Sequence, residues 1–364
     1  MIIRKTLNLY FTKVFLKSIL GVFLICFAII FLVDLIERIR DLSDEKGFFF
    51  LFGVQMALYR TPGIAEQVLP FAILIGSIVA FLNLTRKLEL AVTRAAGVSV
   101  WQFIKPALFV AAVIGILTSI AYNPLSVWLQ EQSDQMEVQQ FSSGKKFRKS
   151  ETDNIWFRQE GQGGESILSA DRSLNKGLTL IGVTALVFNE DRTFKEQVDA
   201  VSANWKDGYW QLNDARVTTA DSPPELRNEY RLSTFFTQEQ ARQQAESTGS
   251  LSFWGFSAAI DAAERAGLNT NRMRLEFQSH LARPLLFAAM VIIAATFSLK
   301  LTRLGGASHM VLGGISAGFV LYVLSELVGD FGSNGLLEPA LAAWLPALIA
   351  FVLGVTVLLY QEDG

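Results

Sequence analysis

The chain has 364 residues, of which 51% are apolar and only 18% are charged, and it contains 28 phenylalanines. Soluble domains carry about 25% charged residues, so this composition argues against a single soluble globule. The net charge of −2 provides no basic field that would attract nucleic acid. With one cysteine, Cys26, and two histidines, His280 and His309, an intrachain disulfide is impossible and a Cys/His zinc site is nearly excluded.

The apolar residues gather in two blocks, residues 1–123 and 281–360, on either side of a polar stretch. A helix needs about 20 apolar residues to cross a bilayer. Six segments meet or nearly meet that length: about 17–33, 67–84, 101–122, 281–299, 304–328 and 336–360. We therefore predict a membrane α-helical protein with six transmembrane helices, three before and three after an inserted domain.

The first segment follows several bases, as in a signal peptide, but no small-residue cleavage site comes after it, so we expect it to remain as a transmembrane helix. Lys and Arg concentrate in cytoplasmic connections and so predict orientation. The bases of the three basic segments are Arg4, Lys5, Lys13 and Lys17, then Arg86, Lys87, Arg94 and Lys105, then Lys300 and Arg303. Both termini are therefore expected to be cytoplasmic, with the central domain on the other side of the membrane.

Residues 34–60 are expected to form the loop after the first helix, and they contain Arg38, Arg40 and Arg60. A guanidinium matches a phosphate bidentately, so these arginines are candidates for contact with an anionic lipid headgroup. The alternative is an ordinary solvated loop in which the arginines pair with nearby acids.

Acidic residues are nearly absent from the middle of the spans. Asp34, Glu66 and Glu326 lie near the outer ends of their helices, where we expect them to be solvated at the interface. Proton- or sodium-coupled carriers usually bury acids near the midplane of the membrane, so the pattern argues against such a carrier.

The connection at residues 85–99 is the most informative stretch. Residues 86–96 favour a short helix that Gly97 can end. One side of it is apolar, and the other is charged through Arg86, Lys87, Glu89 and Arg94. Such a helix either lies on lipid headgroups or docks as a coupling helix into a groove of a cytoplasmic partner. Glu89 favours docking, because an acid gains nothing from anionic lipid.

Residues 125–250 contain short segments rich in Val, Ile, Phe and Thr, separated by turn signals. Residues 203–212 predict a hairpin around Asp207-Gly208, and the regular spacing of strands favours a sandwich or jelly roll. Residues 255–267 favour a helix. The domain has no histidine for a Ser–His–Asp set and no phosphate-binding loop, so we predict a binding or scaffolding module rather than a catalytic one.

The fifth span carries a run of small residues that permits close helix contact, either as static packing or as an opening seam. The run consists of Gly313, Gly314, Ser316, Ala317 and Gly318.

We divide the chain into three parts. Residues 1–123 contain three helices and the amphipathic segment at about 85–97, residues 124–278 contain the β domain and its helical exit, and residues 279–364 contain three helices. No Walker A sequence is present, so any ATP used in transport must be hydrolysed by a separate subunit.

In its order and spacing the whole chain resembles the bacterial lipopolysaccharide-export permeases of the LptF/LptG family. The stretches that carry the resemblance are VLPF at 68–71, LELAVTRAAGVS at 88–99, WKDGYWQL at 205–212 and HLARPL at 280–285. The runs at 314–324 and 341–346 look more like the LptG branch of the family than the LptF branch.

The resemblance implies a permease subunit of an ABC-type transporter in the bacterial inner membrane. Such a subunit has a periplasmic β-jellyroll, extracts lipopolysaccharide from the outer leaflet through a lateral gate and passes it to a periplasmic bridge, in the service of outer-membrane biogenesis. It is not an enzyme and has no cofactor of its own. The implied partners are a paralogous LptF-like permease subunit, a cytoplasmic LptB-like ATPase dimer that binds the ATP, and an LptC-like protein with a single span.

The resemblance also assigns roles to residues of this chain. Glu89 matches the acid of the family's coupling helix, and Phe31 and Phe319 are placed near the lateral gate. Some family members carry a cation in the outer half of the first helix, where this chain has Phe31, so Arg38 or Arg40 is the expected substitute. The alternatives are a permease for another envelope lipid or lipoprotein, and a membrane-anchored periplasmic scaffold.

Overall fold

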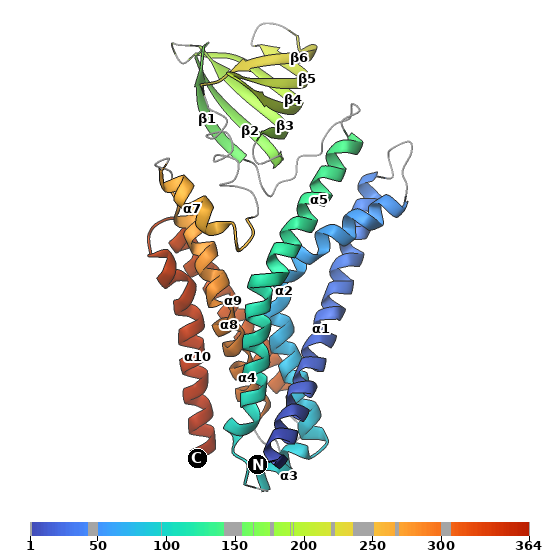
Figure 1. Ribbon diagram of the computed structural model, residues 1–364, viewed down its shortest axis with the longest axis vertical. Helices are drawn as coiled ribbons and strands as arrows, with labels where there is room; N and C mark the ends of the chain where they lie inside the picture. The colour runs from blue at the N-terminus through green and yellow to red at the C-terminus, as the bar shows by residue number, and fades with distance from the viewer. Residues whose placement is uncertain are drawn as a thin grey trace. The chain divides into compact units, whose positions relative to one another are not determined.

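A computed structural model describes residues 2–42, 50–95, 97–141, 155–162, 164–174, 178–189, 191, 193–219, 223–235, 251–265, 269–299 and 307–363. The chain forms two compact units (Figure 1). Unit 1 combines Met1–Leu129 with Asn269–Gly364, and unit 2 consists of Gln130–Leu268. Unit 2 is therefore an insertion between two helical blocks, as the distribution of apolar residues predicts.

Within the described ranges, six helical rods are long and apolar enough to cross a membrane, which confirms the predicted six. They are α1 (Ile2–Leu42), α2 (Phe50–Arg86), α4 (Val100–Leu117) with its continuation, α8 (Asn271–Ser298), α9 (Ala307–Ser333) and α10 (Pro339–Asp363). α4 continues through a π-helical turn, η1 (Thr118–Tyr122), into α5 (Asn123–Phe141).

The helices extend beyond the apolar segments, so the expected loop over residues 34–60 is wrong. α1 continues to Leu42 and α2 begins at Phe50, which places Arg38, Arg40 and Arg60 in helices. Apolar length sets only how much of a helix lies in hydrocarbon. Leu, Glu and Arg favour helix in water as well, so the rod continues past the apolar stretch.

α2 and α8 form the centre of unit 1. In the most apolar stretch of each helix, 61% of α2 and 67% of α8 is buried, against 17% of α1 and 17% of α9. α2 packs against α1, α8 and α9, whereas α8 packs against α2, α4, α9 and α10. The core between them is rich in aromatic rings, which explains the many phenylalanines of the first block. Its fully buried rings are Phe11, Phe15, Phe81, Phe103 and Phe287.

Small residues let these helices approach closely, as the run in the fifth span predicts. Gly318 and Gly314 of α9 face Leu74 and Ile78 of α2, and a Cβ at Gly314 would lie 3.0 Å from Ile78 Cδ1. A Cβ at Gly76 of α2 would lie 2.6 Å from a backbone atom of α1. Larger side chains at these positions would push the helices apart.

The described residues of unit 2 include one antiparallel sheet, with strands in the order β1 to β6. The strands are β1 (Ile155–Gly161), β2 (Gly164–Leu174), β3 (Thr179–Phe188), β4 (Phe194–Lys206), β5 (Tyr209–Thr219) and β6 (Glu225–Ser233). The inserted β domain is confirmed, but its described strands form an up-and-down meander instead of the crossed connections of a jelly roll. The short turn at Asp207-Gly208, where Gly208 has φ +83°, joins β4 to β5.

The sheet curls so that its first and last strands meet at one end. The Phe235 amide, just after β6, donates a hydrogen bond to the Glu160 carbonyl of β1 at 2.9 Å. The buried Gln159 of β1 accepts hydrogen bonds from Trp210 Nε1 of β5 at 3.1 Å and from the Thr234 hydroxyl at 2.8 Å. The curl encloses an apolar face, which explains why a single sheet has a core. The expected helix near residue 255 is α7 (Phe256–Arg265).

Candidate functional site

The segment between α2 and α4 forms a short helix, α3 (Glu89–Ala95), which lies between two residues with left-handed backbone. Leu88 before it has φ +59°, and Gly97 after it has φ +81°. This conformation costs a residue with a side chain about 1–2 kcal/mol, whereas glycine adopts it freely. Backbone hydrogen bonds hold the sharp turn from α2 into α3: the Leu88 amide donates to the Thr85 carbonyl and the Val92 amide to the Leu88 carbonyl, both at 3.0 Å.

α3 has a buried side and an exposed apolar side. Leu90 belongs to the core of unit 1, with 6% of its surface exposed. Leu88 and Val92 are 65% and 66% exposed. These two apolar side chains are left uncovered by the rest of the described chain.

Glu89 connects α3 to the first helix. The hydroxyl of Tyr10 on α1 hydrogen-bonds to the Glu89 carboxylate, at 2.9 Å from Oε2 and 3.1 Å from Oε1. Tyr10 is 41% exposed, so the contact lies at the protein surface. Arg86 and Lys87 are exposed just before it, and the side chain of Arg94 lies outside the described part of the chain.

The other residues selected from the sequence are spread over three helices. Arg38 and Arg40 lie near the end of α1, with Arg40 exposed and Arg38 half-buried, and Arg60 is half-buried on α2. Phe31 is half-buried on α1, and Phe319 is 56% exposed on α9. Both of these helices pack against α2, so the two gate candidates share a neighbouring helix.

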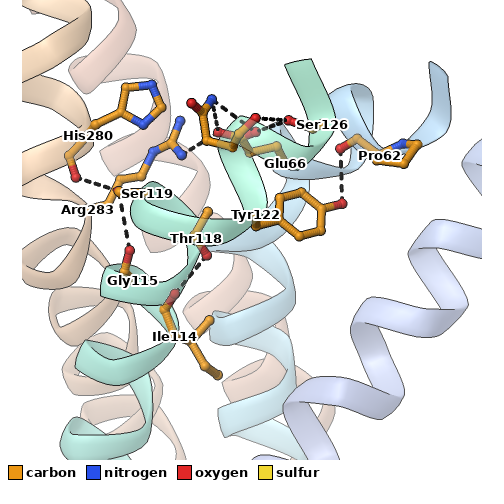
Figure 2. Close-up of polar contacts among 11 residues, drawn as sticks. Pro62, Glu66, Ile114, Gly115, Thr118, Ser119, Tyr122, Ser126, His280 and Arg283 are labelled. Atoms are coloured by element: carbon orange, nitrogen blue, oxygen red, sulfur yellow. Dashed lines mark hydrogen bonds and ion pairs between the residues drawn. The ribbon is translucent and has the colours of Figure 1, made fainter. Parts of the chain in front are cut away.

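A polar cluster lies between α2, α5 and α8 (Figure 2). Glu66 on α2 forms an ion pair with Arg283 on α8. Its carboxylate also accepts hydrogen bonds from Asn123 Nδ2 at 3.1 Å and from Ser126 Oγ at 2.9 Å, both on α5. The Glu66 side chain is 7% exposed and that of Arg283 is 23% exposed. Because a carboxylate removed from water needs such donors, this one group ties three helices together.

A second polar contact lies beside this cluster, where α4 meets α8. Pro284 has no N–H, so the carbonyl of His280, one turn earlier in α8, cannot receive the usual helix hydrogen bond. The Ser119 hydroxyl of η1 donates to this carbonyl at 2.7 Å (Figure 2). The helices approach closely here, because a Cβ at Gly115 would lie 2.6 Å from Pro284 Cα. Serine side chains commonly satisfy carbonyls that proline frees inside membrane helices.

Sequence reasoning missed this cluster and misjudged two acids. Glu66 and Asp34 are buried, so the expected solvation is wrong for both, whereas Glu326 is exposed. The available signal was Arg283-Pro284 near the start of the fourth apolar segment, because an arginine there requires a partner. The identity of that partner depends on which helices are neighbours, and this one sequence does not contain that information.

Six apolar helices interrupted by an inserted β domain define a multi-pass membrane protein. The family model described as "Lipopolysaccharide export system permease LptF/LptG" matches residues 9–360, so the chain belongs to the LptF/LptG family and the resemblance predicted from its motifs is confirmed. Two relatives are named "Lipopolysaccharide export system permease protein LptG". The one from Escherichia coli K12 is 23% identical over 92% of this chain and 94% of its own length. The one from Haemophilus influenzae is 20% identical over 96% of each.

Proposed function

We propose that this chain is the permease subunit of an ABC-type transporter that extracts lipopolysaccharide from the outer leaflet of the inner membrane. The single observation that carries the proposal is the family match over residues 9–360, because it includes both helical blocks and the β domain between them. In the proposed orientation, both termini and α3 are cytoplasmic and unit 2 is periplasmic, since the short connections with most Lys and Arg then lie inside.

α3 is the proposed contact for a cytoplasmic ATPase dimer. Exposed Leu88 and Val92 supply an apolar anchor, and Glu89 supplies a charge that a basic groove can bind. The chain has no Walker A sequence of its own, so the energy must enter through such a contact. The proposed coupling segment comprises Arg86, Lys87, Glu89, Arg94 and Gly97.

The contact between Tyr10 and Glu89 supports a direct route from the ATPase to the lipid gate. α1 is one continuous helix from Ile2 to Leu42, so a displacement of α3 acts on the helix that carries Phe31. We place the lateral gate along α1 and along α9 with Phe319. Each of these helices would face the LptF-like paralogue or the LptC-like single-span partner, because only 17% of its apolar window is buried within this chain.

The proposed path keeps the lipid tails away from water throughout. Tails that enter sideways from the membrane exchange one apolar environment for another, so entry has no hydrophobic cost. Arg38, Arg40 and Arg60 are the proposed contacts for headgroup phosphates. The curled sheet of unit 2 has an apolar inner face that would receive the tails before they pass to the periplasmic bridge.

A charge reversal on α3 tests the proposal. Glu89→Lys removes the acceptor for Tyr10 and reverses the charge offered to the partner. Glu338→Lys is the matched control, because Glu338 is an exposed acid in the connection between α9 and α10. With the complex purified through a tag on this chain, Glu89→Lys should reduce lipid-stimulated ATP hydrolysis and lipopolysaccharide release at least tenfold, while membrane insertion is unchanged. Normal release by Glu89→Lys would refute the coupling role.

The same purification separates the alternatives. A stoichiometric nucleotide-binding subunit together with lipopolysaccharide supports the proposal. Another bound envelope lipid or a lipoprotein would point to a different permease. Recovery of periplasmic proteins alone, without an ATPase, would support a membrane-anchored scaffold.

A further inference from the structure

In the part of the chain that the structure describes, Arg283 has one protein contact, which uses one of its hydrogen-bond donors. A guanidinium has five N–H donors in a planar fork. Among the described residues, the ion pair from Nη1 to Glu66 is the contact that the structure shows for this side chain. The side chain is 23% exposed in the isolated chain. The remaining donors need acceptors, because an N–H group without one is costly in apolar surroundings.

The cluster also lies at the ends of three apolar segments, where the hydrocarbon region is expected to end. Glu66 immediately precedes the apolar segment at 67–84, and Asn123 immediately follows the one at 101–122. Arg283 is the third residue of the apolar segment at 281–299. The same boundary of the hydrocarbon therefore passes through the cluster in three helices, and the headgroup region begins there.

Glu66 can position Arg283 while leaving part of the positive charge of the guanidinium available to an anion. The carboxylate already accepts hydrogen bonds from Asn123 at 3.1 Å and Ser126 at 2.9 Å. It is 7% exposed, so a bound anion would approach the arginine rather than the acid. A buried ion pair stabilises a fold less than apolar packing of the same volume, so stability alone does not account for this one.

We propose that Arg283 is a binding site for the phosphate group of a membrane lipid, with Glu66 as the residue that positions it. The free edge of the guanidinium matches two phosphate oxygens, the geometry in which arginine binds phosphate most strongly. The site uses none of the headgroup candidates Arg38, Arg40 and Arg60. This proposal rests on the proposed function only in so far as the bound lipid is the exported lipid.

The test compares two lipids with the same acyl chains, one with a phosphate-containing headgroup and one without. The full chain in dodecyl maltoside micelles, which contain no phosphate, is titrated with phosphatidylglycerol or with diacylglycerol of the same chains, and adducts are counted by native mass spectrometry. The wild type should prefer phosphatidylglycerol about tenfold, the size of one charge-assisted contact. Glu66→Gln should raise this preference, because it removes the competing negative charge while an acceptor oxygen remains.

Arg283→Gln alone leaves Glu66 charged and buried, so it can fail for lack of folding. The decisive variant is therefore Glu66→Gln combined with Arg283→Gln, which keeps neutral hydrogen-bonding groups at both positions and should bind the two lipids equally. Arg272→Gln is the matched control, because Arg272 pairs with Glu276 on the same helix at 3.3 Å and is 62% exposed. It should keep the wild-type preference.

The outcomes separate the possibilities. A folded double variant that still prefers phosphatidylglycerol overturns the site, and a Glu66→Gln variant whose preference does not rise overturns the role given to Glu66. Binding of inorganic phosphate without any preference between the lipids overturns the lipid assignment. The assay requires no export, so the site can stand even if Glu89→Lys transports normally and the proposed function fails.

Discussion

Removing the Ser119 hydroxyl should destabilise unit 1 because of a proline on another helix. Ser119→Ala removes the hydroxyl that donates to the His280 carbonyl, and Pro284 has no N–H to replace it. Hydrogen bonds between membrane helices contribute about 0.6 kcal/mol on average and about 1.7 kcal/mol at most. The bond here is short, at 2.7 Å, and Ser119 is 4% exposed, so we expect a loss near the upper end, about 1.5 kcal/mol.

The cause can be tested by restoring the backbone N–H group at residue 284. In a Pro284→Ala background the residue at 284 can donate to the His280 carbonyl, so Ser119→Ala should cost about 0.5 kcal/mol or less. The wild type, Ser119→Ala, Pro284→Ala and the double variant are unfolded with sodium dodecyl sulfate in mixed micelles. Unfolding is followed by far-ultraviolet circular dichroism. Ser325→Ala is the control, because Ser325 bonds to a carbonyl of its own helix at 2.9 Å. An equal penalty for Ser119→Ala in both backgrounds would show that the hydroxyl acts on something other than the carbonyl that proline frees.

Two further predictions concern one helix contact and the β domain. A Cβ at Gly76 would lie 2.6 Å from Ile19 Cα, so Gly76→Ala should lower the free energy of unfolding by about 1–3 kcal/mol in the same assay. Gly21→Ala is the control: a Cβ there has nothing within 4 Å, so this variant should be neutral or slightly stabilising. Burial and a hydrogen bond to Glu196 raise the pKa of Tyr230 in the folded protein. The protonated hydroxyl therefore stabilises the fold below the unfolded-state pKa of about 10, and this stabilisation is lost as the pH rises above that value. Melting temperatures between pH 9 and 11 should therefore fall more steeply for the wild type than for Tyr230→Phe, and parallel curves would contradict this.

The sequence was sufficient wherever a property follows from local composition. Apolar stretches identified six spans, because a bilayer requires a minimum apolar length wherever the helix packs. Alternation and turn residues identified the strands, and Asp207-Gly208 located a hairpin because that dipeptide adopts the required turn. The loop expected over residues 34–60 was wrong, since helix propensity continues where hydropathy stops.

What the sequence by itself determined is the class of this protein: a membrane helical chain with an inserted β domain and the motifs of a family. Only the tertiary structure decided which side chains meet. Glu66 and Arg283 are 217 positions apart, and Ser119 and His280 are 161 apart, yet both pairs are in contact. The described strands also form one curled meander, whereas the sequence favoured a sandwich or a jelly roll. The physical reason is that hydropathy and turn propensity act over a few residues, whereas the partner of a buried charge or a freed carbonyl depends on how distant helices pack.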